Sequence, residues 1–209
     1  MPRSAALNQE LRDASRRRIL DAALRLFAER GYAGTPVDAI VRDAGISPGL
    51  LYHYFPSKLD LLRALFAESM TDVRASFAAA DAARDPAGRL AALLGAATEI
   101  VRERRDFWTL SYGVRMQREV LTALGADLFA WTAEIHAVLQ RYLTEAGWPD
   151  PAIEARLLFA SIDGIHQHYV LAPDHYPIDA ITARLIDRYR TPPVPPKRRA
   201  APPAARRTR

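Results

Sequence analysis

Apolar side chains recur at intervals of three and four residues along most of the chain, which is the period of an α-helix with one buried face. The stretch over residues 16–30 is typical and has apolar residues at Ile19, Ala22, Ala23, Leu26 and Phe27. The same pattern predicts helices over residues 16–30, 36–44, 48–55, 57–77, 85–101, 107–116, 121–142, 151–171 and 178–189. No stretch shows the clear alternation of a β-strand. The sequence therefore predicts an all-α protein.

Two consecutive short helices are separated by a tight turn. A hydroxyl residue followed by a proline, which is a start signal of a helix, occurs at Thr35-Pro36 and again at Ser47-Pro48. Between them, Gly45 is free to adopt the left-handed conformation that ends a helix. This arrangement indicates a helix-turn-helix, the unit whose second helix enters the major groove of DNA.

Residues 16–65 also carry several motifs in a fixed order. They are an ILDAALRLFAERGY first helix, a T-x-V-x-x-I second helix, an AGIS-x-G turn, the segment LYHYF and an SK-x-x-L start of the next helix. With these motifs, the stretch resembles the DNA-binding domain of the TetR family of transcriptional regulators. The resemblance implies a three-helix head with a helix-turn-helix over about residues 35–55. A long helix would join this head to a larger helical domain for ligand binding and dimerisation.

The helix pattern and the resemblance together divide the chain into four parts. We expect a flexible arm over residues 1–14, the DNA-binding domain over 15–62, and the effector-binding and dimerisation domain over 63–190. Residues 191–209 contain six prolines, six basic residues and no acidic residue, a composition that favours disorder. This tail is either a non-specific phosphate-binding arm or a solubilising terminus.

The resemblance assigns candidate DNA contacts by position in the motif. The candidates are Thr35, Pro36, Ser47, Pro48, Gly49, Leu50, Tyr52, His53, Tyr54 and Lys58. Base-edge contacts are expected from residues 47–50 and His53, and phosphate contacts from Tyr52, Tyr54, Lys58 and the helix start at Thr35. Small residues at 47–49 allow the backbone to approach the bases, and Pro48 and Leu50 suit thymine methyl groups.

The predicted recognition helix departs from common DNA readers in two ways. Many relatives carry histidine where Tyr54 stands; tyrosine keeps a hydroxyl donor but has a different reach. The helix also lacks Arg, Asn and Gln, the usual bidentate base readers. We therefore expect few direct hydrogen bonds to bases and a larger share of recognition through DNA shape.

Aromatic residues cluster in the middle of the chain and predict a ligand pocket. The candidate lining residues are Phe107, Trp108, Tyr112, Met116, Phe129, Trp131, Phe159, Asp163 and His166. Apolar walls with a few polar groups are typical of ligand sites, although aromatic residues equally suit a packed core. Asp163 and His166 either orient a ligand or pair with each other or with Arg115. The expected effector is small and largely apolar or aromatic.

The last two predicted helices favour a homodimer. The candidate interface residues are Leu157, Ser161, Gly164, His168, Ile178, Ile181 and Leu185. Ser161 and Gly164 are small enough to let another helix approach closely, and a four-helix bundle across a two-fold axis would bury the set. The alternative is that these faces pack only within their own subunit.

Charge and composition limit the remaining possibilities. The net charge of +5 falls to −1 without the six basic residues of the tail, so DNA binding must depend on local charge. The chain has no cysteine, no signal-peptide run and no long uncharged apolar segment, so we expect a cytoplasmic protein without membrane contact. Neighbouring histidines on a helix point in different directions, so His166, His168, His175, Asp163 and Asp174 predict no metal site. No cofactor is expected.

These observations favour a ligand-responsive transcriptional regulator, most simply a homodimeric repressor released from a palindromic operator by its effector. Effector binding would move the long helix that starts near residue 57 and change the distance between the two recognition helices. Activation in place of repression stays open. The alternatives are an enzyme, for which no catalytic motif is present, a sequence-independent DNA-coating protein that depends on the tail, and a regulator without a usable pocket.

Overall fold

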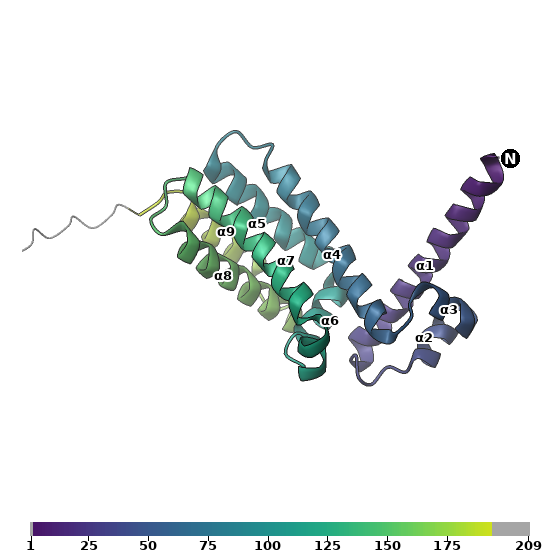
Figure 1. Ribbon diagram of the computed structural model, residues 1–209. Coiled ribbons are helices and arrows are strands. Elements are labelled where there is room, and N and C mark those ends of the chain that lie inside the picture. The colour runs from purple at the N-terminus through teal and green to yellow at the C-terminus, as the bar shows by residue number, and fades with distance from the viewer. Residues whose placement is uncertain (1, 194–209) are drawn as a thin grey trace, which may run out of the picture.

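The computed structural model describes residues 2–193, with side chains from residue 7 onward, and this part of the chain forms nine α-helices and no strand (Figure 1). The helices are α1 (Pro2–Arg30), α2 (Val37–Ala44), α3 (Pro48–Tyr54), α4 (Lys58–Ala80), α5 (Pro86–Glu103), α6 (Arg105–Val114), α7 (Arg118–Glu145), α8 (Pro151–Leu171) and α9 (Ile178–Tyr189). The all-α prediction is confirmed. The tail predicted over residues 191–209 lies, from residue 194 onward, outside the described residues.

The first helix is longer than the sequence pattern predicts. The arm expected over residues 1–14 is helical from Pro2, and α1 extends away from the rest of the molecule (Figure 1). The helix follows from the sequence, because no glycine or proline interrupts residues 3–30 and the segment is rich in good helix formers. The flexibility expected of residues 1–14 stays a prediction. Leu7 and Leu11 stay exposed on this extension, so the apolar period was no guide to its conformation.

The N-terminal core is larger than the predicted DNA-binding domain. Ile19 and Phe27 of α1, Ile40 of α2 and Leu51 of α3 are fully buried together. The same hydrophobic cluster continues into α6 and the start of α7, where it includes Phe107, Leu110, Val114, Val120 and Leu124. The head is therefore packed on α6 and α7 and is not attached through α4 alone.

A second hydrophobic cluster holds the rest of the body together. It is formed by the C-terminal half of α4, by α5, by the C-terminal half of α7 and by α8 and α9, with Leu139, Tyr142 and Leu158 fully buried. In Figure 1 these helices run roughly side by side as a bundle next to the head. The helix α4 is continuous through both clusters, as the sequence predicted for the helix that joins head and body.

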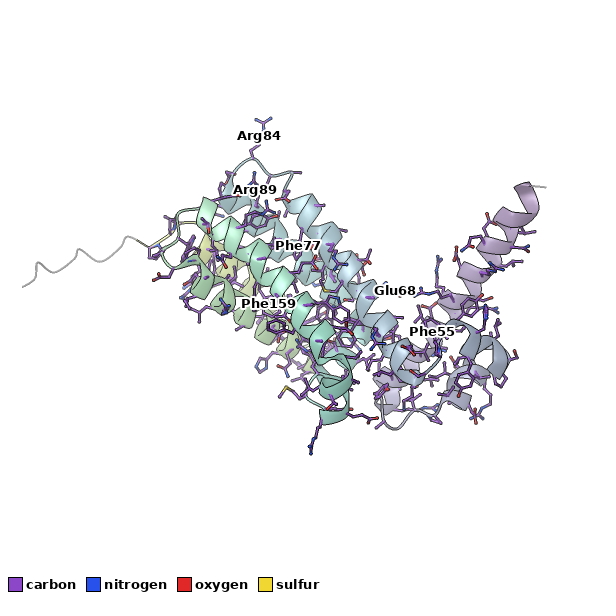
Figure 2. All side chains as sticks on the ribbon, viewed as in Figure 1. Phe55, Glu68, Phe77, Arg84, Arg89 and Phe159 are labelled. Carbon is purple, nitrogen blue, oxygen red and sulfur yellow. The ribbon has the colours of Figure 1, made fainter. Side chains whose placement is uncertain are left out.

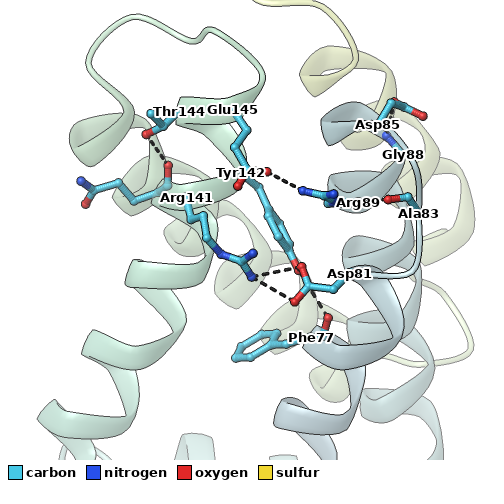
Figure 3. A network of polar contacts seen from close by, with 11 residues as sticks. Phe77, Asp81, Ala83, Asp85, Gly88, Arg89, Arg141, Tyr142, Thr144 and Glu145 are labelled. Carbon is cyan, nitrogen blue, oxygen red and sulfur yellow. Dashed lines mark hydrogen bonds and ion pairs between the residues drawn. The ribbon is translucent and has the colours of Figure 1, made fainter.

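Ion pairs fasten α4 to α7 along its length. They are Arg63–Asp127 at 3.1 Å, Arg74–Glu134 at 2.7 Å and Asp81–Arg141 at 3.1 Å. At the end of the bundle away from the head, the Tyr142 hydroxyl also donates to Asp81 at 2.8 Å, and Arg89 of α5 pairs with Glu145 at 2.5 Å (Figure 3). These contacts join the C-terminal end of α4 to α7 and the start of α5 to α7.

Candidate DNA-binding and ligand-binding sites

The geometry of α2, the turn and α3 follows from three residues that the sequence singled out. Gly45 ends α2 with φ of 63° and ψ of 42°, the left-handed conformation that a side chain would strain. The Ser47 side chain caps α3 by accepting from the Leu50 backbone N–H at 3.3 Å, and Pro48 follows in the first turn. Ser57 caps α4 by accepting from the Asp60 backbone N–H at 3.2 Å.

One face of α3 is open to solvent, as is its N-terminal end. The opposite face is packed on α1 and α2. Leu51 and Phe55 are buried in the head, while Leu50 is half-buried. The exposed candidates are Pro36, Ser47, Pro48, Gly49, Tyr52 and His53. Tyr54 is half-buried and packs against the head core. The helix that would read DNA therefore presents small and polar groups outward from a rigid base.

Thr35 does not fulfil either role that the sequence suggested. It is 0% exposed, and its hydroxyl donates to the carbonyls of Leu26 at 3.0 Å and Gly31 at 2.8 Å. The residue that caps α2 is Pro36, without a side-chain hydrogen bond. The Thr35 side chain is corrected from a phosphate contact to a buried group, since its hydroxyl satisfies the carbonyls at the end of α1.

Lys58 also faces inward in part. Its ammonium donates to the carbonyls of Tyr32 at 2.8 Å and Thr35 at 3.0 Å and lies 4.5 Å from the centre of the Tyr32 ring. Burial lowers the pKa of Lys58. The lysine therefore joins the start of α4 to the loop before α2, and one of its three N–H donors is left for a phosphate.

The body contains a cavity at the boundary between the two hydrophobic clusters. Its volume, taken as the space open to the centre of a water molecule, is about 130 Å³. Phe66 and Phe107 of the first cluster and Phe77, Leu93 and Leu139 of the second contribute to its wall. Figure 2 shows Phe77 and Phe159 among the side chains that fill the interior of the bundle. Because the cavity touches both clusters, a molecule bound there would contact the head-packed helices and the rest of the body at once.

Most of the predicted pocket residues line this cavity. They are Phe107, Trp108, Tyr112, Trp131, Phe159, Asp163 and His166. Met116 and Phe129 do not: they are 83% and 77% exposed, and their placement in the pocket is corrected. Met116 lies in the turn after α6, and Phe129 lies on the solvent side of α7, so being aromatic or apolar did not fix the direction in which they point.

The aromatic cluster in the sequence did not indicate the contribution of α4 and α5 to the wall. The missed residues include Phe66, Met70, Val73, Phe77, Leu93, Ala97 and Ile100. Their helical period was visible, but a period identifies a buried face without saying whether it meets another helix or a cavity.

The polar end of the cavity is an ion pair between α6 and α8. Arg115 donates to both carboxylate oxygens of Asp163, at 3.0 and 3.1 Å, and its guanidinium lies 4.6 Å from the centre of the Tyr112 ring. The Tyr112 hydroxyl donates to the Asp163 backbone carbonyl at 3.3 Å. Burial, followed by the charge of Asp163, raises the pKa of Tyr112. Of the pairings left open for Asp163, the structure shows the one with Arg115.

His166 belongs to a separate buried group. Its Nε2 lies 3.4 Å from the Thr98 hydroxyl, which in turn lies 3.1 Å from the Thr182 hydroxyl. Burial lowers the pKa of His166 to about 4, so the ring is neutral at physiological pH. Within residues 2–193 no cluster of His, Asp and Glu side chains is arranged to hold a metal ion.

The predicted interface residues lie mainly on the outer faces of α8 and α9. Leu157 is 55% exposed, Ser161 and His168 are exposed, and Gly164, Ile181 and Leu185 are half-buried. A shallow groove between the two helices includes Ile165, Ile181 and Leu185. Ile178 is 4% exposed and packs within its own subunit, so its assignment to an interface is corrected.

A helix-turn-helix with an outward-facing second helix, carried by a larger helical body, defines a DNA-binding regulatory protein. No helix in the described part of the chain has the length and apolar character needed to cross a membrane.

Comparison with known proteins gives a family match for the N-terminal part of the chain. Residues 19–65 match the family described as bacterial regulatory proteins, tetR family. Over 179 residues, the chain is 28% identical to the HTH-type transcriptional regulator BetI of Brucella anthropi, covering 83% of this chain and 90% of the relative. Over 52 residues it is 44% identical to the fatty acid metabolism regulator protein of Bacillus subtilis, covering 25% and 27% of the two chains.

Solved structures confirm the fold. The fatty acid degradation regulator FadR from Bacillus halodurans superposes with a TM-score of 0.76 at 22% identity, covering 84% of this chain and 94% of that one. FadR from Bacillus subtilis in complex with stearoyl-CoA gives 0.71 at 20% identity, covering 82% and 96%. Residues 19–65 therefore match the tetR family of bacterial regulatory proteins, as the motifs indicated, and the chain shares its overall fold with solved TetR-family regulators.

Proposed function

We propose that the protein is a homodimeric repressor that binds a palindromic operator and is released from it by a small, largely apolar or aromatic effector. The observation that carries this proposal is the combination of an exposed α3 face with an aromatic-lined cavity in the same chain. We expect it to act in the cytoplasm, where it meets DNA.

The outward face of α3 suits the major groove. Pro48 and Gly49 present little bulk, so the helix backbone can approach base edges, and Tyr52 and His53 can donate to phosphates or bases. A single seven-residue helix contacts few bases. Two heads on one two-fold axis would meet half-sites about 34–36 Å apart, or a multiple of that distance.

The second copy would dock on α8 and α9. These helices leave the large apolar side chains of Ile153, Leu157 and Leu171 exposed, and the shallow groove between them contains Ile181 and Leu185. Exposed apolar surface next to small residues is typical of an interface between helices. Ser161 and Gly164 supply those small positions.

The cavity would hold the effector, and its position would let effector binding change the affinity of the protein for DNA. The FadR of Bacillus subtilis, which shares this fold, was solved with stearoyl-CoA, so the fold admits an effector. Here the cavity wall combines residues of both hydrophobic clusters, so a bound molecule would favour one arrangement of the head-packed helices over another. The coupling must be reciprocal: operator weakens effector binding by the factor by which effector weakens operator binding.

The first experiment is selection of bound sequences from a random DNA pool at near-physiological salt, with full-length protein. Enrichment of a two-fold palindrome is expected. A matched pair of variants then tests α3: Gly49→Glu places a carboxylate in open space on the exposed face, and Ala126→Glu places one on the exposed side of α7. We expect Gly49→Glu to weaken operator binding by more than about tenfold and Ala126→Glu to leave it unchanged.

Two results would count against the proposal. Binding without sequence preference that falls steeply with salt would indicate a DNA-coating protein. A specific palindrome whose binding no candidate molecule alters, together with no ligand uptake by the cavity, would indicate a regulator without an effector.

A further inference from the structure

The aromatic wall of the cavity favours a planar ring as the body of the effector. Trp131 stacks on Phe66, with ring centres 5.8 Å apart and planes within 7° of parallel, and Phe66 meets Phe107 edge-on at 5.3 Å. The series continues through Trp108 and Tyr112, at 5.3 and 5.9 Å between successive rings. Ring faces and edges recognise another ring through their quadrupoles as well as through apolar contact.

The volume of the cavity indicates the size of the ring body that fits inside it. At about 130 Å³, the cavity resembles an engineered apolar cavity of about 150 Å³ that binds benzene in another protein. Met70 lies on the wall and its unbranched side chain can change rotamer, so a somewhat larger molecule fits without moving a helix.

The two charged side chains on the cavity wall neutralise each other without a ligand. Among the residues that the structure describes, Arg115 and Asp163 are the charged side chains on the wall, and each satisfies the other. Their side chains are 28% and 29% exposed, so neither charge is fully hydrated. An anionic ligand would have to take Arg115 from Asp163, and a cationic ligand would have to take Asp163 from Arg115. Either exchange leaves one protein charge half-buried without its partner, which is unfavourable.

A buried hydrogen-bond donor of a wall residue has no partner. The indole Nε1 of Trp108 is buried and finds no acceptor within residues 2–193. A buried donor without an acceptor is destabilising, so a ligand that brings an acceptor gains affinity by satisfying it.

We propose that the effector is an uncharged molecule with a planar ring body and a hydrogen-bond acceptor, and that the Arg115–Asp163 pair excludes charged analogues. The inference rests on the proposed function, because it takes the cavity to be the effector site. Trp108 then donates the hydrogen bond to the acceptor of the ligand. The Arg115–Asp163 pair stays intact when such a ligand binds, and this selects against charged molecules.

The test compares four single-ring probes of similar size by calorimetric titration of the full-length dimer or monomer as isolated. Ethylbenzene is the apolar probe and acetophenone the neutral probe with an acceptor. Phenylacetate is the anionic probe and benzylammonium the cationic one. We expect acetophenone to bind, and phenylacetate and benzylammonium to bind at least about tenfold more weakly. In Trp108→Phe, which keeps an aromatic side chain but removes the N–H, the preference for acetophenone over ethylbenzene should fall by about fivefold.

Two variants test the ion pair by gain of binding. Asp163→Asn frees Arg115 and should tighten phenylacetate binding by about tenfold, and Arg115→Met frees Asp163 and should do the same for benzylammonium. Glu134→Gln, which frees Arg74 in the exposed pair between α4 and α7, is the matched control and should change none of the four affinities.

The outcomes separate this inference from the proposed function. Wild-type binding of phenylacetate or benzylammonium as tight as that of acetophenone would overturn the inference while leaving the cavity an effector site. Unchanged probe selectivity in Trp108→Phe, Asp163→Asn and Arg115→Met would also overturn it. Failure of every probe to bind the wild-type protein would overturn the inference and the effector part of the proposed function together.

Discussion

His166 lies inside the body with a neutral ring, held between the cavity and the hydroxyls of Thr98 and Thr182. Its side chain is buried, and the Thr98 hydroxyl already donates to the Leu94 carbonyl at 3.0 Å, which leaves that oxygen free to accept from an imidazole N–H. A protonated ring here would carry its charge into an apolar interior.

The pH dependence of stability follows from this burial. The pKa of His166 is lowered to about 4 in the folded state, while in the unfolded chain it is near 6.5. As the pH falls from about 6.5 toward 4, the unfolded chain takes up a proton that the folded chain refuses, so folding stability is lost over this window, by up to about 3 kcal/mol. We expect urea unfolding at a series of pH values to show this loss and His166→Gln to reduce it.

The control for this prediction is His175→Gln, which removes an exposed imidazole outside the body core. Burial also lowers the pKa of His136, so a weaker dependence of the same sign should persist in His166→Gln. An identical pH profile in wild type and His166→Gln would contradict the assignment.

Single residues show where the sequence was sufficient and where it was not. Ser47 and Gly45 were predicted correctly because a cap and a left-handed turn are decided by neighbours within a few residues. Thr35 was misplaced because its two carbonyl partners belong to α1 and the loop after it, at distances along the chain that no local signal reports. The pairing of Asp163 with Arg115, 48 residues apart, was one alternative among three for the same reason.

At the scale of elements, the turn between α2 and α3 depends on one glycine. A side chain at Gly45 would meet no other atom within 4 Å, so a substitution there is penalised by the left-handed backbone alone. We expect Gly45→Ala to lower the free energy of unfolding by about 1–2 kcal/mol. Chemical denaturation followed by circular dichroism measures this value directly.

Gly95 provides the matched comparison. It lies within the helix α5, and its added Cβ would also meet nothing within 4 Å. Because alanine favours a helix more than glycine does, Gly95→Ala should raise the free energy of unfolding by up to about 1 kcal/mol. Equal effects of the two substitutions would show that the left-handed turn is not what Gly45 is needed for.

Helix positions were predictable from the sequence, whereas helix partners were not. Apolar period, caps and prolines located all nine helices of residues 2–193 to within a few residues, apart from the start of α1. The predicted boundary at residues 62 and 63 stays a prediction, but it falls within α4, and Phe107 and Leu124 from beyond it pack in the head core. Period reports which face of a helix is buried and gives no information on the helix that covers it.

At the scale of the molecule, the proposed dimer depends on the outer face of α8 and α9. We expect Leu157→Asp, which places a charge in the exposed apolar face, to convert the dimer to monomer and to weaken operator binding by about tenfold or more, because two linked heads bind more tightly than one. Sedimentation at micromolar concentration gives the oligomeric state. Phe129→Asp, on the solvent side of α7, should leave both unchanged. A dimeric Leu157→Asp would place the interface elsewhere.

The polar contacts at the far end of α4 make this helix a lever. With 23 residues and a rise of 1.5 Å per residue, α4 is about 34 Å long, and the contacts of Asp81 with Arg141 and Tyr142 hold its C-terminal end to α7 (Figure 3). A tilt of about 5° about that end moves the opposite end, where the head begins, by about 3 Å, and the Arg63–Asp127 pair and the packing of the head on α6 and α7 would have to adjust to it. Such a displacement equals the length of a hydrogen bond. A small rotation of α4 would therefore be enough to break the contacts between the recognition helix and the major groove.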